Sequence, residues 1–281
     1  MTAGQILTST WSWDPSVLAG CVALLGLYFY AGWGLTTTRH KIFFSSGVLV
    51  LFLALESPLE ELGDTYLFSA HMLQHLLLIL IVPPLLLWGL SRSLTQRILV
   101  WPWANRVEQI LRRPLVAWPV AMVTLWLWHL PVLYNATLLN ENIHIGEHLM
   151  FLVTATIFWW PVLNPLQEKR LAPLTTVFYL FAAAASSSAL GIILTFAQPG
   201  LYPAYLQPED ALGILPLLRQ TWGLTPAVDQ QLGGLLMWVP GSLVYLSGIL
   251  GALGRWYSEP EPETEGELAG SNPQQRNQLF T

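Results

Sequence analysis

The stretch SAHMLQHLLLILIVPPLLLWGL, residues 69–90, indicates the fold class of this chain. It is apolar over the length of about 20 residues that an α-helix needs to cross a hydrocarbon core of about 30 Å. Its first two turns nevertheless carry two histidines and a glutamine, which are costly to bury in lipid. The stretch therefore predicts a membrane helix whose first turns have polar partners elsewhere in the protein.

Six further apolar blocks accompany this one. They run over residues 15–34, 42–57, 115–133, 146–164, 173–197 and 231–253. The chain is 53% apolar and only 10% charged, whereas soluble domains carry about 25% charged residues. We predict an all-α, polytopic membrane protein, folded as a seven-transmembrane-helix bundle over residues 1–257. Residues 258–281, which open on SEPEPETEGE, are expected to form a disordered acidic cytoplasmic tail.

The lysines and arginines indicate an orientation. All of them except Arg219 fall in segments that share one side of the predicted membrane. They are Arg39, Lys41, Arg92, Arg97, Arg106, Arg112, Arg113, Lys169, Arg170, Arg255 and Arg276. Because cytoplasmic segments are enriched in basic residues, the N-terminus is expected outside and the C-terminus in the cytoplasm.

Several local patterns refine this picture. Pro83 and Pro84 are expected to kink or interrupt the third helix. Residues 187 and 191, Ser and Gly, have the small-xxx-small spacing that lets membrane helices approach closely. The stretch WPWANRVEQILRRP is either a short interfacial amphipathic helix or a plain loop. Residues 198–230 form the longest outside segment and are expected to cap the outer face of the bundle.

Other classes of protein are excluded by the same composition. There is no basic run or nucleic-acid-binding motif. The single cysteine, Cys21, excludes an intramolecular disulfide framework. Retinal binding through a Schiff base is disfavoured because the two lysines, Lys41 and Lys169, both fall on the cytoplasmic side.

Five of the six histidines fall at one depth, near the outer surface, in this topology. They are His71, His75, His129, His144 and His148. Two pairs have the form H-x-x-[Q/E]-H, and positions i, i+3 and i+4 lie on one face of an α-helix. Two facing helices with such pairs offer four imidazole nitrogens to a metal ion, as in bundle cores. A hydrogen-bonded packing cluster is the alternative.

Neighbouring side chains are candidates for supporting roles. Gln74 and Glu147, the residues inside the two pairs, are candidate ligands or acceptors that fix a histidine tautomer. Asp229 and Gln230, at the start of the seventh block, are expected at the same surface. Asp229 there is either a helix N-cap or a metal-transfer residue. The softer groups expected nearby are Met72, Met150, Met237 and Cys21. Thioethers and a thiol favour Cu(I), although methionines also serve as packing residues.

Three segments in order resemble the CtaG family of assembly factors for caa3-type cytochrome c oxidases. They are HMLQHLLL, WHLPVLYNATLLNENIHIGEHLMFL followed by FWWPV, and DQQLGGLLMWVPG. The resemblance implies a multi-pass protein of the bacterial cytoplasmic (inner) membrane that helps to place copper in the oxidase catalytic subunit. Other copper-delivery factors are expected as further partners. The family's characteristic positions would correspond here to the five histidines with Gln74, Glu147, Asp229 and Gln230.

Rival functions remain open at this point. The segment from His144 to His148 also matches the zinc-hydrolase motif H-x-x-E-H, in which the Glu is a general base. We prefer a protein that is not an enzyme and that binds copper rather than zinc. A haem-binding electron carrier fits poorly because a second histidine one turn away would be redundant at the iron. A transporter is disfavoured because the sequence has no paired broken helices.

Overall fold

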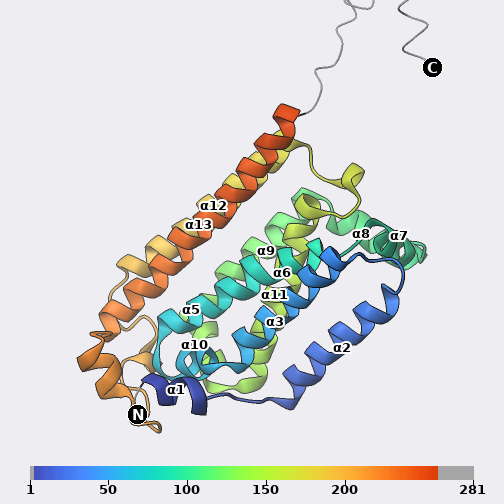
Figure 1. The fold of residues 1–281 in the computed structure, drawn as a ribbon. Coiled ribbons are helices and arrows are strands. Elements are labelled where there is room, and N and C mark those ends of the chain that lie inside the picture. Colours follow the sequence, from blue (N-terminus) through green and yellow to red (C-terminus); the bar gives the residue numbers. More distant parts are fainter. Residues whose placement is uncertain (1–2, 259–281) are drawn as a thin grey trace, which may run out of the picture.

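The computed structural model describes residues 3–258, which fold into helices and connecting segments without any β-strand (Figure 1). The N-terminal half holds α1 (Ala3–Ser9), α2 (Pro15–Ala31), α3 (Thr38–Glu56), α4 (Pro58–Glu61), η1 (Leu62–Tyr66), α5 (Phe68–Leu76), η2 (Leu77–Ile81), α6 (Val82–Trp88), α7 (Arg92–Leu99) and α8 (Pro102–Leu111). The rest holds α9 (Pro114–Trp128), α10 (Pro131–Leu139), α11 (Glu141–Leu163), η3 (Gln167–Lys169), α12 (Pro173–Phe196), η4 (Pro203–Tyr205), η5 (Leu217–Thr221) and α13 (Pro226–Ser258). The prediction of an all-α fold is confirmed for these residues.

Each of the seven apolar blocks is helical, but they differ in length. Five helices are long and apolar enough to cross a membrane: α3, the continuous run α5–η2–α6, α11, α12 and α13. The number rises to six if α8 and α9, bent by 74° at their junction, count as one span. The first block forms α2, a shorter apolar helix. The predicted acidic tail begins at Ser258, which is the last described residue, and the rest of it lies outside the described residues.

The helix interruption predicted at Pro83 and Pro84 takes the form of a π-helical turn. Because Pro83 has no N–H, the carbonyl of Ile79 loses its ordinary partner four residues on. The turn η2 forms just before the prolines, with the Val82 N–H bonded to the Leu77 carbonyl. The indole Nε1 of Trp159 on α11 donates to the free Ile79 carbonyl over 3.0 Å. This bond ties α11 to the run that carries the first histidine pair.

Two long helices pack closely through glycine. Helices α12 and α13 run side by side along one flank of the bundle (Figure 1). A Cβ atom placed on Gly191 would lie 3.0 Å from the Gly234 carbonyl oxygen, and one on Gly234 would overlap the hydroxyl oxygen and the backbone nitrogen of Thr195. The close approach predicted for Gly191 is therefore present, with Gly234 as the facing residue.

Substituting Gly234 tests this contact. We expect Gly234→Ala to destabilise the protein by about 1–3 kcal/mol, because overpacking forces the two backbones apart. Gly251→Ala is the matched control on the same helix, because no atom lies within 4 Å of a Cβ there. It should leave stability unchanged or raise it slightly. Thermal unfolding in detergent measures both; equal melting temperatures for the two variants would contradict the close contact.

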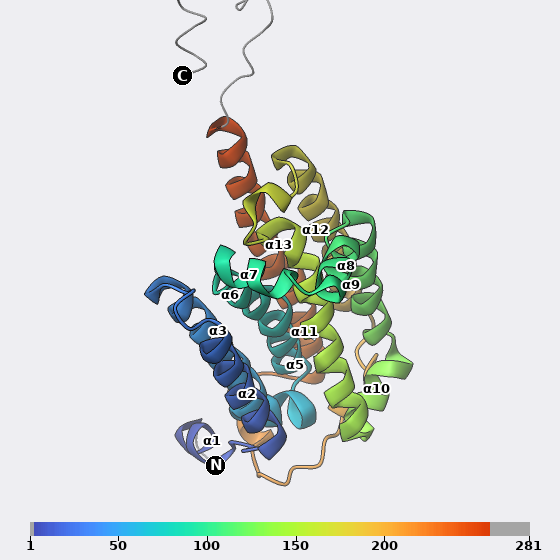
Figure 2. The same ribbon diagram turned by 90° about the vertical axis from the view of Figure 1, so that its right-hand side faces the viewer.

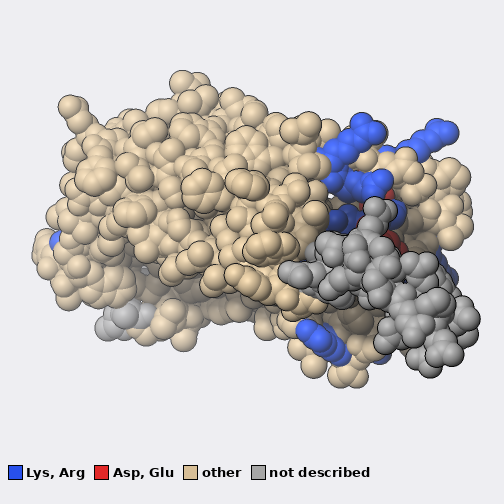
Figure 3. Space-filling view, turned by 90° about the horizontal axis from the view of Figure 1, so that it is seen from above, with Lys and Arg blue, Asp and Glu red and all other residues tan. Residues whose placement is uncertain are grey.

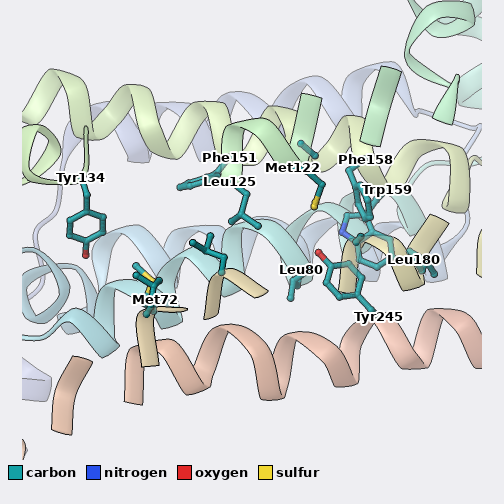
Figure 4. Packing of buried hydrophobic residues seen from close by; sticks show 14 of the residues in the cluster. Met72, Leu80, Met122, Leu125, Tyr134, Phe151, Phe158, Trp159, Leu180 and Tyr245 are labelled. Carbon is teal, nitrogen blue, oxygen red and sulfur yellow. The ribbon is translucent and has the colours of Figure 1, made fainter. Parts of the chain in front are cut away.

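The central core lies between the run α5–η2–α6, α9, α11 and the pair α12–α13. Figure 4 shows Met72 and Tyr134 toward one end of this core and Trp159 and Leu180 toward the other. In Figure 2, α5 and α11 stand between α3 on one side and α9 on the other. The helices that carry the two histidine pairs are therefore in the middle of the bundle.

The two ends of the bundle differ in charge. The start of α3, the helices α7 and α8, and the end of α13 all lie toward one end of the bundle, away from the start of α5 (Figure 1). The basic side chains gather toward that end in Figure 3. Residues 102–111 in this region form the helix α8. Of the two alternatives predicted for this stretch, a helix and a plain loop, the helix is therefore the one observed. The far end is the one that carries the histidines.

Residues 197–225 cover the histidine end. The Tyr202 hydroxyl donates to the His129 carbonyl over 2.8 Å. The Tyr205 hydroxyl donates to the Gly63 carbonyl over 2.7 Å and lies 2.9 Å from the Tyr134 hydroxyl. Ile214 and Leu218 are buried against Tyr66. The segment therefore packs over this end of the bundle, as predicted.

Candidate metal centre

The two predicted histidine pairs face each other. Along α5, the ring centroids of His71 and His75 are 4.2 Å apart, and along α11 those of His144 and His148 are 4.1 Å apart. Across the two helices, the centroids of His71 and His144 are 5.3 Å apart and those of His75 and His148 are 5.6 Å apart. None of the four residues is more than 8% exposed.

His129 joins the pairs from a third helix. It follows the last residue of α9, and its ring centroid lies 5.8 Å from that of His75. Its Nδ1 bonds to the Leu125 carbonyl oxygen over 2.7 Å. Because a carbonyl only accepts, Nδ1 carries the proton and Nε2 keeps its lone pair. Five histidines predicted at one depth thus form one cluster.

Glu147 lies within this cluster and is fully buried. Its Oε2 is 3.8 Å from Nε2 of His71, and its Oε1 is 3.8 Å from Nε2 of His75. These distances are too long for hydrogen bonds. They suit two ligands of one ion, because bonds of about 2.0–2.2 Å place two ligand atoms about 3–4 Å apart. Glu147 is therefore placed as a candidate ligand.

Many polar atoms of the cluster have no hydrogen-bond partner among the described residues. Within residues 3–258, no hydrogen bond reaches either oxygen of Glu147 or the Nε2 atoms of the five histidines. Buried polar atoms without partners are rare because each costs about 1–3 kcal/mol. One ligand atom each from His71, His144, Glu147 and His148 lies within 4.8 Å of the others. A cation at this point would satisfy several of these atoms at once.

Asp64 and Glu60 complete the site. Neither carboxylate was predicted as a site residue from the sequence. Asp64 on η1 has Oδ2 3.3 Å from Nδ1 of His144 and Oδ1 3.6 Å from Nδ1 of His71. A Cβ on Gly63 would lie 3.0 Å from the His71 backbone nitrogen, so η1 packs directly on α5. A carboxylate on one nitrogen orients an imidazole so that its other nitrogen can bind metal.

The two carboxylates ionise differently. Burial acts to raise the pKa of Asp64, but contacts with His144 and His71 outweigh it and hold this pKa below its usual value. Burial raises the pKa of Glu60 to about 8, and the charge of Asp64 acts in the same direction. The short segment ESPLEELGD, residues 56–64, carried a signal for both, since it places acids just before the first histidine pair.

The remaining polar candidates have other partners. The Gln74 amide donates to the Ala54 carbonyl over 3.0 Å and to Glu60, rather than to a histidine ring. Gln230 bonds to backbone groups around residues 194–200. Asp229 accepts from the backbone N–H groups of Phe68 and Ser69 at 2.8 and 3.1 Å and from the Ser69 hydroxyl. It therefore caps α5, across the bundle, and fixes the helix that carries the first pair.

The softer candidate ligands lie on two sides of the cluster. Met72 and Met237 line a cavity of about 40 Å³ together with His75 and His129. Cys21 lines a cavity of about 780 Å³ together with His144 and His148. Met150 is 45% exposed and does not line either cavity. The cluster thus lies between a narrow, methionine-lined cavity and a wide one with a thiol in its wall.

Comparison with known proteins places the chain in a family. Two uncharacterized proteins, from Mycobacterium bovis and Mycobacterium tuberculosis, are each 22% identical to it over 91% of its length. The chain spans about 40% of the length of these relatives. No solved structure matches the chain. The sequence matches a family model over residues 26–259, which include the whole histidine cluster, and the chain therefore belongs to the CtaG family of cytochrome c oxidase caa3 assembly factors.

Proposed function

We propose that this protein is a copper chaperone of the respiratory chain, which binds copper at the five-histidine cluster and passes it to the catalytic subunit of a haem-copper cytochrome c oxidase. The family supports the oxidase as the partner. Other copper-delivery factors are expected to load the cluster or to receive metal from it. In this proposal copper is cargo, and the protein does not catalyse a reaction.

Glu147 is the observation that carries this proposal. A fully buried carboxylate without a hydrogen-bond partner is unstable in a protein interior unless a cation or a proton neutralises it. The Nε2 atoms of His71 and His75, both on α5, lie 3.8 Å from its oxygens. His144 and His148, on α11, each offer a ligand atom within 4.8 Å of Glu147. His71, Glu147, His144 and His148 would hold the ion, and His75 and His129 stand next to them on the side of the narrow cavity.

Copper is favoured over zinc by the groups around the cluster. Here thioethers of Met72 and Met237 flank His75 and His129, and the Cys21 thiol lies in the wall of the wide cavity beside His144 and His148. Soft sulfur ligands on both sides suit the exchange of Cu(I).

We further propose that all seven apolar blocks cross the bacterial cytoplasmic membrane, with the N-terminus outside and the C-terminus in the cytoplasm. Residues 1–257 would form one transmembrane domain. The gathering of basic side chains at the end opposite the histidines supports this orientation (Figure 3). The short helix α2 supports a seventh span because Val22 and Leu27 expose apolar side chains of the kind that lipid covers. The metal cluster would then face the outer side.

Glu147→Gln separates the chaperone from a zinc hydrolase. If Glu147 is a ligand, the amide variant should lose about tenfold or more in metal affinity, because it removes the negative charge from a buried site. If Glu147 were a general base, the variant would keep its metal and lose only activity. Metal titration of the purified variant makes the distinction; unchanged affinity would contradict the ligand role.

Oxidase assembly tests the function itself. In a strain whose own gene is deleted, the wild-type protein should restore copper content and activity of the oxidase in membranes. The His75→Ala/His148→Ala variant, present at the same level, should restore neither. His40→Ala is the control, since His40 lies at the start of α3, away from the cluster, and its ring bonds to the Thr37 hydroxyl. Full oxidase activity with the double variant would overturn the proposal.

A further inference from the structure

We propose that Glu60, Asp64 and His144 form a second metal site, at which a divalent cation binds before it reaches the buried cluster. This inference rests on the metal-binding function proposed above. One ligand atom from each of the three residues lies within 4.8 Å of the other two. Three ligands leave coordination positions open, as expected for a site that binds an ion in passing.

The location of this group suits the uptake of metal. All three residues line the cavity of about 780 Å³, whose wall also includes the exposed residues Ser12 and Glu141. Of the four residues of the inner group, only His144 and His148 line this cavity. An ion that arrives through the cavity therefore meets the carboxylates together with His144, while Glu147 and His71 lie behind them.

His144 connects the two groups. Its Nδ1 faces Asp64 at 3.3 Å, whereas its Nε2 is buried and has no hydrogen-bond partner. It belongs both to the outer group and to the inner group of His71, Glu147 and His148. Because the two sites share one imidazole, they are occupied in turn. A metal ion that moves inward exchanges carboxylate oxygens for imidazole nitrogens, and at His144 it exchanges Nδ1 for Nε2.

The donor atoms determine which ions the outer group takes. Two carboxylates and one imidazole suit Cu²⁺ and Zn²⁺, whereas Cu⁺ prefers thiolate and thioether ligands. Among residues 3–258, no lysine or arginine forms an ion pair with Glu60 or Asp64. Asp64 instead faces the rings of His71 and His144, and its negative charge in a cleft raises the local concentration of cations. The outer group is thus an acidic uptake site for divalent ions.

Uptake kinetics test this site. We expect Glu60→Gln/Asp64→Asn to take up Zn²⁺ or Cu²⁺ about tenfold more slowly than the wild type, in line with the electrostatic and ligand contribution to on-rates. Binding at saturating metal should be retained, because the four residues of the inner group are unchanged, whereas the affinity is expected to fall because Asp64 no longer orients His71 and His144. Uptake of Cu⁺ from a soluble chelate should keep its wild-type rate. Rapid-mixing experiments on the full-length protein in detergent follow all three.

Glu61→Gln/Glu141→Gln is the matched control. It likewise removes two carboxylates from the same cavity wall but leaves the three ligands in place. Its uptake rate should stay within about twofold of the wild type, since general attraction of ions is a weaker effect than ligation. If the double variant of Glu60 and Asp64 fails to fold, the two single variants carry the test, because each removes one ligand.

Three outcomes would overturn the inference. They are wild-type uptake rates in Glu60→Gln/Asp64→Asn, an equal slowing in the control, and an equal slowing for Cu⁺. The failure of the proposed function looks different. In that case the wild-type protein itself would take up neither Cu⁺ nor a divalent ion, and both proposals would fall together.

Discussion

His148→Ala should lower the affinity of the protein for copper by at least about 100-fold. His148 belongs to the inner group of candidate ligands, and its Nε2 is buried without another partner. Even residues that only orient a ligand are worth about 10–100-fold in metal affinity, so the loss of a ligand is expected to exceed that range. Competition between the protein and a chelator of known affinity measures the change.

His40→Ala supplies the control for this prediction. His40 lies at the opposite end of the bundle, where its Nδ1 is 2.8 Å from the Thr37 hydroxyl. Its removal should leave the copper affinity unchanged. An affinity of His148→Ala within threefold of the wild type would show that His148 is not a ligand.

Asp229→Ala should cause the largest loss of stability among substitutions outside the metal cluster. The Asp229 carboxylate accepts three hydrogen bonds from Phe68 and Ser69 at the start of α5 and is 1% exposed. Its removal leaves these donors unsatisfied in a buried place. We expect a cost of about 2–4 kcal/mol, since hydrogen bonds to a charged group contribute about 1.5–3 kcal/mol each and are not additive. Thermal unfolding in detergent measures the loss.

Two further variants sharpen this test. Asp229→Asn keeps one acceptor oxygen, so its melting temperature should fall between those of Asp229→Ala and the wild type. Glu209→Ala removes an exposed acid from the covering segment and should have little effect on the melting temperature. A melting temperature of Asp229→Ala equal to that of Glu209→Ala would contradict a capping role for Asp229 on α5.

The histidine cluster was predictable because helix geometry decides most of it. The spacing of four residues places His71 beside His75, and His144 beside His148. The order of the apolar blocks then brings both pairs and His129 to one end of the bundle. The sequence alone does not show how each helix is rotated about its own axis. Only the ring distances therefore show that the two pairs face each other.

The same limit explains what the sequence did not reveal. Asp229 and Gln230 were expected near the histidines, but their side chains point to the start of α5 and to the backbone near residues 194–200. Asp64 was missed because it lies in a connection, and its position depends on the π-helical turn η1 and on the close packing of Gly63 against His71. Such turns carry no periodic signal.

The fold was predictable where long apolar runs determine it. The apolar runs that form α3, α11, α12 and α13 are longer than the apolar stretches that a soluble core needs. Their composition alone therefore identified them as candidate membrane helices. The first and fourth blocks gave α2 and α9, which are shorter, and α9 is bent by 74° from α8. That bend is set by Pro114 at the start of α9, a local feature that a hydropathy window averages out.

The metal content of the purified protein tests the central claim most directly. Wild-type protein and His75→Ala/His148→Ala would be loaded with Cu(I) or Zn(II), washed and analysed for bound metal. We predict that the wild type retains copper and that the double variant loses it. Retention of zinc alone would contradict the copper assignment. A wild type that retains neither metal, or a double variant that retains as much copper as the wild type, would contradict the proposed metal centre.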